Sequence, residues 1–120
     1  MMTWARRNRQ NNNWYYIQQR ERAMKYNKQV TCKDGFKMSV QAGENLSSNP
    51  KQNSAERYES VEIGYPSEKE SLILEYAEGP NDPTDTIYAY VPVHIVTLVI
   101  AKHGGMVSGE VPPGVIVPPA

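Results

Sequence analysis

The apolar stretch over residues 86–105 constrains the fold more than any other part of the chain. Residues 86–91 alternate between two sets of side chains, which predicts a strand with one buried face. Pro92 cannot donate to a ladder and suits the first turn of a helix, so we expect the strand to end there and a helix to begin. Residues 93–102 are nearly all apolar, which predicts a helix buried almost all round. The glycine pair at 104–105 predicts its left-handed end.

Residues 29–42 have the pattern of a β-hairpin around Asp34 and Gly35. A two-residue loop would mix apolar and polar side chains on each face of this hairpin. A three-residue loop over 33–35 makes both faces consistent, as a fixed register requires. The pairs that it predicts are Val30 with Met38, Thr31 with Lys37 and Cys32 with Phe36. Gly35 is then expected in the left-handed position of a G1 bulge.

A third strand and a second helix are predicted in the second half of the chain. Alternation over residues 58–65 predicts the strand, and Pro66 ends it. Ser67 and Glu70 have the spacing of a capping box, which predicts a short helix that ends before Gly79. Its inward stripe would comprise Leu72, Ile73, Tyr76 and Ala77. The predicted fold class is therefore α+β: a small antiparallel sheet of about four strands with two helices on one face.

The length of 120 residues predicts one domain with extended ends. We expect a basic aromatic arm over residues 1–28, a compact domain over residues 29–105 and a Pro-rich tail over residues 106–120. Two Val-Pro-Pro motifs make this tail polyproline-like, and we expect it either in an aromatic-lined groove or in solvent. Residues 43–57 are polar and aperiodic, which predicts a long loop that is either functional or a flexible insertion.

The formal net charge is zero, but the charge is unevenly distributed along the chain. Residues 1–28 hold seven basic residues and one acidic residue, a net charge of +6. Residues 29–120 hold six basic and twelve acidic residues, a net charge of −6. A basic arm of this kind can fold back on its acidic domain or bind an anionic partner. The small core also favours stabilisation by a protein partner or a homo-oligomer.

The arm contains the residues that we expect to bind a partner: Arg6, Arg7, Arg9, Trp14, Ile17, Arg20 and Arg22. From Trp14 onward its composition favours a helix, with Trp14, Ile17 and Met24 on one stripe. Arginines with aromatic residues can bind RNA or DNA through phosphate contacts and base stacking. The apolar stripe instead favours docking on protein, because a polyanion offers no surface that would bury it. We prefer the docking interpretation for this reason.

Candidate catalytic and metal-ligating residues are few. His94 and His103 are nine residues apart, so on one helix they would lie on opposite faces and could not share a metal. We expect His103 to interact with the helix dipole, His94 to be a surface or packing residue, and Cys32 to be a buried core thiol. Acidic residues are numerous, but most of them are expected on solvent faces and their spacing selects no pair for acid/base catalysis: Glu56, Glu59, Glu62, Glu68, Glu70, Glu75 and Glu78. We therefore predict no enzymatic activity, no cofactor and no metal.

The sequence also bears on the compartment in which the protein acts. With Cys32 as its only cysteine, the chain can form no internal disulfide, which favours a reducing compartment. The N-terminus lacks the apolar region of a signal peptide, and no apolar run approaches the ~20 residues of a membrane span. The glycosylation sequon at Asn45 is discounted for the same reason. We predict an intracellular protein, or one assembled inside a cell, without a membrane association.

Several ordered blocks resemble a family of small uncharacterised proteins encoded by tailed phages and prophages. The blocks are V-T-C-K-D-G-F-K-M-S-V-Q-A at 30–42, Y-E-S-V-E-I-G-Y-P-S at 58–67, I-Y-A-Y-V-P-V at 87–93 and H-G-G at 103–105. The resemblance covers roughly residues 30–109 and does not include the arm. It implies a phage accessory or virion-associated protein, located in the host cytoplasm or in the virion.

Three hypotheses for function follow from these observations. The first is a non-catalytic accessory protein that binds a host or phage macromolecule, for example a host defence component. The second is a virion or assembly component whose arms are ordered by neighbouring subunits, since polar and Pro-rich ends are rarely ordered alone. The third is a nucleic-acid-binding protein that uses the basic arm.

Overall fold

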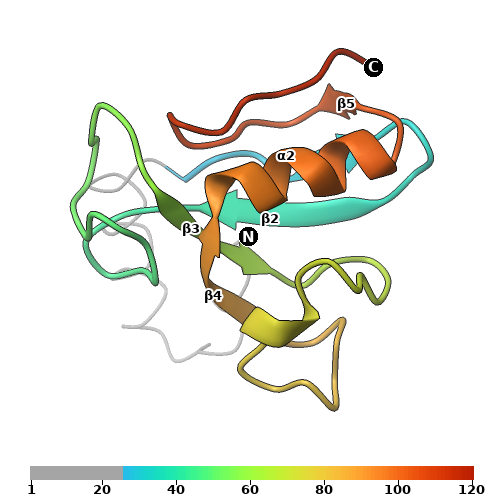
Figure 1. The fold of residues 1–120 in the computed structure, drawn as a ribbon, viewed down its shortest axis with the longest axis horizontal. Coiled ribbons are helices and arrows are strands. Elements are labelled where there is room, and N and C mark those ends of the chain that lie inside the picture. The colour runs from blue at the N-terminus through green and yellow to red at the C-terminus, as the bar shows by residue number, and fades with distance from the viewer. Residues whose placement is uncertain (1–25) are drawn as a thin grey trace, which may run out of the picture.

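The computed structural model describes residues 26–120. Within them, five strands form one antiparallel sheet, and one α-helix packs against a face of it (Figure 1). The elements are β1 (Val30–Cys32), β2 (Lys37–Gln41), β3 (Ser60–Gly64), the 3-10 helix η2 (Leu74–Tyr76), β4 (Ile87–Pro92), α2 (Val93–Lys102) and β5 (Met106–Ser108). The strand order is β4-β3-β2-β1-β5. The predicted α+β class with a small antiparallel sheet is confirmed, with five strands instead of about four.

The β1–β2 hairpin has the predicted register. Val30 pairs with Met38 and Thr31 with Lys37. The Cys32 N–H donates to the Phe36 carbonyl at 2.8 Å, which closes a three-residue loop. Gly35 has a φ of +97°, the left-handed conformation that the loop requires. Cys32 is 1% exposed, so the predicted burial of its thiol is also confirmed.

A β-bulge in β4 breaks the alternation that residues 86–91 predict. Ile63 of β3 pairs with Tyr88 and Val61 with Val91, so β4 advances three residues while β3 advances two. Tyr90 has a φ of +52° at this point. The extra residue brings Tyr88 and Val91 to the same side, and both side chains are fully buried. A strict period of two would have placed them on opposite faces, so the prediction of unbroken alternation is wrong.

Helix α2 begins and ends at the predicted residues, Val93 and Lys102. Pro92 has non-helical dihedral angles at its N-cap, and both glycines that follow His103 have a positive φ. The prediction that the helix is buried almost all round is wrong. Val96, Val99 and Ile100 face the sheet, whereas Leu98 is 49% exposed because the opposite side of the helix meets solvent.

The helix predicted after Pro66 is also wrong. Residues 67–73 form turns, and only η2 follows them. The Ser67 hydroxyl does not cap a helix but accepts the Lys37 N–H at 2.9 Å. Glu70 does not return to Ser67 either, because its carboxylate points into the protein and accepts the Leu72 N–H at 2.8 Å. The predicted strand over residues 58–65 is present in a shorter form, Ser60–Gly64.

Residues 106–120 fold back onto the domain. β5 pairs with β1, and the chain then returns beside α2 towards the end of β5 (Figure 1). The Glu110 N–H donates to the Lys28 carbonyl at 3.1 Å, and the Thr97 hydroxyl donates to the Ile116 carbonyl at 2.6 Å. These bonds attach the returning segment at two separate places, so it forms part of the folded unit.

Candidate functional site

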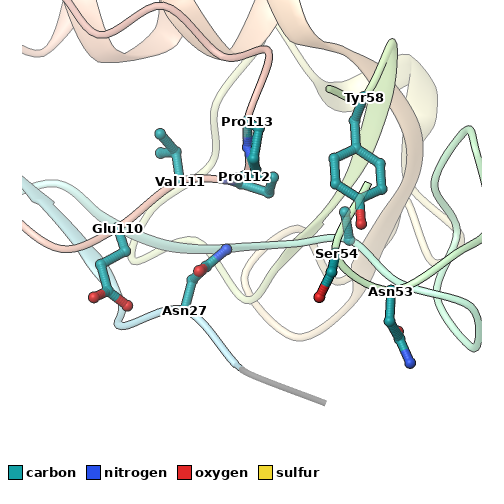
Figure 2. A pocket seen from close by; sticks show the side chains of 9 residues that line it. Asn27, Asn53, Ser54, Tyr58, Glu110, Val111, Pro112 and Pro113 are labelled. Carbon is teal, nitrogen blue, oxygen red and sulfur yellow. The ribbon is translucent and has the colours of Figure 1, made fainter. Parts of the chain in front are cut away.

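An open pocket of about 370 Å³ lies where three separate segments meet (Figure 2). The segments are the residues that precede β1, the end of the 43–57 loop with Tyr58, and the returning tail. The lining residues are Asn27, Ala42, Asn53, Ser54, Tyr58, Glu110, Val111, Pro112 and Pro113. Asn27 and Glu110 lie on one side, Asn53 and Ser54 on the other, and the two prolines lie between them (Figure 2). The pocket adjoins the start of the described residues, where the basic arm joins the domain.

Tyr58 holds the loop side of the pocket. Its hydroxyl donates to the Gln52 carbonyl at 2.6 Å and accepts the Ala55 N–H at 3.2 Å. Its backbone N–H donates to the Pro113 carbonyl at 2.9 Å, which joins the loop to the tail. Gly114 makes this approach possible, because a Cβ at this residue would come within 2.4 Å of the Tyr58 carbonyl oxygen. The loop and the tail therefore form one fixed wall.

Paired hydrogen bonds hold the opposite side. The Asn27 N–H donates to Gln41 Oε1 at 2.8 Å, and Gln41 Nε2 donates back to the Asn27 carbonyl at 2.8 Å. The Lys28 N–H donates to Glu110 Oε1 at 3.0 Å, while the Glu110 N–H donates to the Lys28 carbonyl. These pairs attach the segment before β1 to β2 and to the tail. Each of these hydrogen bonds involves a main-chain group of Asn27 or Lys28, which favours a preformed shape of the pocket.

A second feature is an ionic cluster at the end of α2, with a buried His103–Glu70 pair at its centre. His103 Nδ1 lies 2.7 Å from Asp34 Oδ2, and His103 Nε2 lies 2.7 Å from Glu70 Oε1. Lys102 Nζ lies 2.9 Å from Glu70 Oε2. The Phe36 ring stacks on the imidazole, with centroids 4.0 Å apart. The side chains of His103 and Glu70 are 6% and 1% exposed, whereas those of Asp34 and Lys102 are 50% and 47% exposed. The cluster therefore joins the β1–β2 turn, residues 67–73 and the end of α2 around a buried His103–Glu70 pair.

Three members of the cluster, His103, Glu70 and Asp34, have shifted pKa values. Burial acts to lower the pKa of His103, but the hydrogen bonds to Asp34 and Glu70 act to raise it and outweigh burial. The pKa of His103 is therefore raised. Burial acts to raise the pKa of Glu70, but hydrogen bonds from the Leu72 N–H, Lys102 and His103 leave it lowered. The pKa of Asp34 is lowered, first by the Phe36 N–H and then by His103. All three shifts favour an imidazolium between two carboxylates.

Both ring nitrogens of His103 are engaged in this arrangement. A neutral imidazole has one N–H, so only the protonated ring can donate to both carboxylates. Neither nitrogen of His103 is left to act on a substrate. Burial raises the pKa of the Cys32 thiol, with a further contribution from the Asp34 carboxylate, and this opposes formation of the reactive thiolate.

The predicted partner-binding residues all belong to the arm and lie outside the described residues. His94 is exposed, as expected of a surface residue, whereas the expectation that His103 acts through the helix dipole is incomplete, because it is buried between two carboxylates. The expectation that Glu70 lies on a solvent face is wrong, because its side chain is 1% exposed. Among residues 26–120, no group of three or more acidic, His or Cys side chains is placed to hold a metal ion.

The sequence contains little signal for either feature. His103 is 69 positions from Asp34 and 33 positions from Glu70, and no local pattern marks a carboxylate that will be buried. The pocket residues come from three distant segments, of which only the Pro-rich tail has a distinctive composition. Pro112 and Pro113 do lie beside an aromatic residue, as one of the two expectations for the tail requires, but this residue is Tyr58 of the same chain.

In comparisons with known proteins, no family model, no curated protein and no solved structure matches this chain. In the part of the chain that the structure describes, no helix is long and apolar enough to cross a membrane.

Proposed function

We propose that the protein is a non-catalytic, phage-type accessory protein that binds a host or phage protein through the pocket at the base of its arm. The observation that carries this proposal is the pocket itself, which is open to solvent and has sides held by hydrogen bonds of main-chain groups. Preformed concave sites of this size are the usual places where proteins bind ligands. The resemblance of residues 30–109 to small phage proteins supplies the biological setting.

The surroundings of His103 and Cys32 support a binding function over a catalytic one, because both side chains are engaged or buried within the fold. Both nitrogens of His103 are engaged by carboxylates, and Cys32 is buried with a raised pKa. The lining residues within 26–120 include neither histidine nor cysteine, and the Tyr58 hydroxyl is hydrogen-bonded to two backbone groups. Its polar groups are suited to recognition by hydrogen bonds. A host defence protein is one partner class that fits an accessory protein of this kind.

Co-purification from phage-producing cells tests this proposal. Ser54 is an exposed rim residue, and Ser54→Arg would fill the pocket with a long side chain. Ser71 is an exposed serine outside the lining, so Ser71→Arg controls for the added length and charge of the side chain. We expect a stoichiometric partner with the native chain and with the Ser71 variant, and loss of that partner with the Ser54 variant. Equal recovery with both variants would exclude the pocket as the binding site.

A second candidate function is a virion or assembly component. Three large apolar side chains are exposed on α2, β5 and the tail: Leu98 at 49%, Val107 at 56% and Ile116 at 75%. Exposed apolar side chains of this kind can be covered by neighbouring subunits. Mass spectrometry of purified particles distinguishes the two functions, because a virion component must be present in the particle at a fixed copy number.

A further inference from the structure

The charge of the pocket restricts its ligand. Among the lining residues that the structure describes, Glu110 is the one charged residue, and none of these residues is a lysine, arginine or histidine. An anionic ligand such as a phosphate group would meet a carboxylate and find no counter-charge. The pocket therefore favours a neutral or cationic group.

The hydrogen bonds already made in the pocket restrict the ligand further. Glu110 uses Oε1 to accept the Lys28 N–H, and that bond does not engage Oε2. Asn27 uses its side-chain nitrogen to donate to the Val40 carbonyl, and that bond does not engage Oδ1. The Ser54 hydroxyl is a third oxygen on the lining, on the opposite side of the pocket (Figure 2). The oxygens on this surface match a ligand rich in donors.

The remaining walls are apolar and flat. Val111, Pro112 and Pro113 lie between the two polar sides (Figure 2), and Ala42 also lines the pocket. A guanidinium group is planar, carries five donors and no acceptor, and is more weakly hydrated than an ammonium group. Such a group can rest against proline rings while its edge donates to oxygens. A cavity of about 370 Å³ is large enough for one arginine side chain with part of its backbone.

We propose that this pocket binds an arginine side chain presented by the protein partner, an inference that rests on the proposed function. Glu110 Oε2 forms the ion pair with the guanidinium, Asn27 and Ser54 accept its other N–H groups, and the Val111–Pro113 wall packs against its plane. Glu110 sets the preference for positive charge, and the prolines set the preference for a planar group over a lysine ammonium.

Titration followed by NMR amide shifts tests this inference on the full chain. The probe is N-acetyl-arginine amide, and the control probe is N-acetyl-citrulline amide, which has nearly the same shape without the charge. We expect saturable shifts at Asn53, Ser54 and Val111, and an affinity for the arginine probe about three- to fivefold above that for citrulline, as for an ion pair at a partly exposed site. Equal affinities for the two probes, or no saturable shifts, would overturn the proposal.

The variant Glu110→Gln gives a second test. Its side-chain oxygen can still accept the Lys28 N–H, so the tail attachment is kept, while the second oxygen becomes an N–H₂ donor that faces the guanidinium. We expect the preference for arginine over citrulline to disappear in this variant and to persist in the control Glu68→Gln, since Glu68 is exposed and outside the lining. An unchanged preference in Glu110→Gln contradicts the assignment.

These outcomes are separate from the test of the proposed function. If the Ser54→Arg variant loses the partner but the native chain does not prefer the arginine probe, the pocket binds another group and only the ligand assignment is wrong. If the native chain prefers arginine but Ser54→Arg keeps the partner, the partner binds elsewhere.

Discussion

Replacing His103 by phenylalanine tests the role of the ionic cluster. Phenylalanine keeps a ring that can stack on Phe36 but offers no N–H to either carboxylate. Glu70 Oε1 would then be a charged atom without a partner in a side chain that is 1% exposed. Removing one partner of a buried ion pair typically costs about 3–5 kcal/mol. Lys102 and the Leu72 N–H still engage the other oxygen, so we expect the lower end of that range.

The free energy of unfolding, measured with urea at pH 6, gives this cost directly. Thermal unfolding should show a Tm lower by about 12–24 °C for a loss of about 3 kcal/mol in a domain of this size. His94→Phe is the matched control, because His94 is an exposed histidine on the same helix, and it should change the stability by less than about 0.5 kcal/mol.

A double variant separates loss of the ion pair from loss of packing. Adding Glu70→Gln to His103→Phe removes the buried charge but keeps an oxygen that can accept the Leu72 N–H. The double variant should therefore recover at least half of the lost stability, since an uncharged pair can replace a buried ion pair at little cost. A double variant less stable than His103→Phe would refute the electrostatic reasoning.

The same cluster gives the stability a defined pH dependence. His103 has a folded pKa above its ordinary 6.5, so its contribution is fully present below that value and is lost as the pH rises through the raised pKa. Glu70 has a folded pKa below its ordinary 4.5, so its contribution is present above that value and is lost as the pH falls through the lowered pKa. The contributions of both groups are fully present between these two limits. The loss of stability that His103 causes as the pH rises above 6.5 should be absent from His103→Phe, whereas a loss at higher pH from the raised pKa of Cys32 should remain.

Three further predictions concern the tail, the thiol and the arm. Gly114→Ala should cost more than Gly35→Ala, because both glycines have a positive φ but only at Gly114 would a Cβ meet backbone, that of Tyr58, at 2.4 Å; urea unfolding should show a difference of at least about 1 kcal/mol. Cys32 should react with a thiol reagent at the rate of unfolding, and a fast reaction in the native protein would contradict its burial. Deleting residues 1–25 should flatten the salt dependence of any RNA binding, by about 0.7 of a log-log unit for each phosphate that the arm neutralises.

Features set by neighbouring residues could be predicted from the sequence. The hairpin register followed from requiring both faces around Gly35 to be consistent, and the pairing confirms it. The bounds of α2 followed from Pro92 at one end and a glycine pair at the other, because both act through local backbone geometry.

Features set by distant residues could not be predicted in this way. Ser67 and Glu70 have the spacing of a capping box, but their side chains bind distant residues. The Ser67 hydroxyl accepts the Lys37 N–H, and the Glu70 carboxylate is hydrogen-bonded to His103, so tertiary contacts override local propensity. The β4 bulge at Tyr90 depends on the pairing of β4 with β3, and the alternation of side chains along β4 does not reveal that pairing. The pocket requires knowing that the tail returns to Tyr58.

Photo-crosslinking from the rim of the pocket tests most directly whether the protein acts by binding a partner there. A photoreactive amino acid at position 54, introduced in phage-producing cells, should yield one major crosslinked protein, with the crosslinked peptide of the partner containing or adjoining an arginine. The same amino acid at position 71, which is exposed but outside the lining, should not yield it. The same crosslinked protein from both positions, or none from position 54, would contradict the proposed binding site.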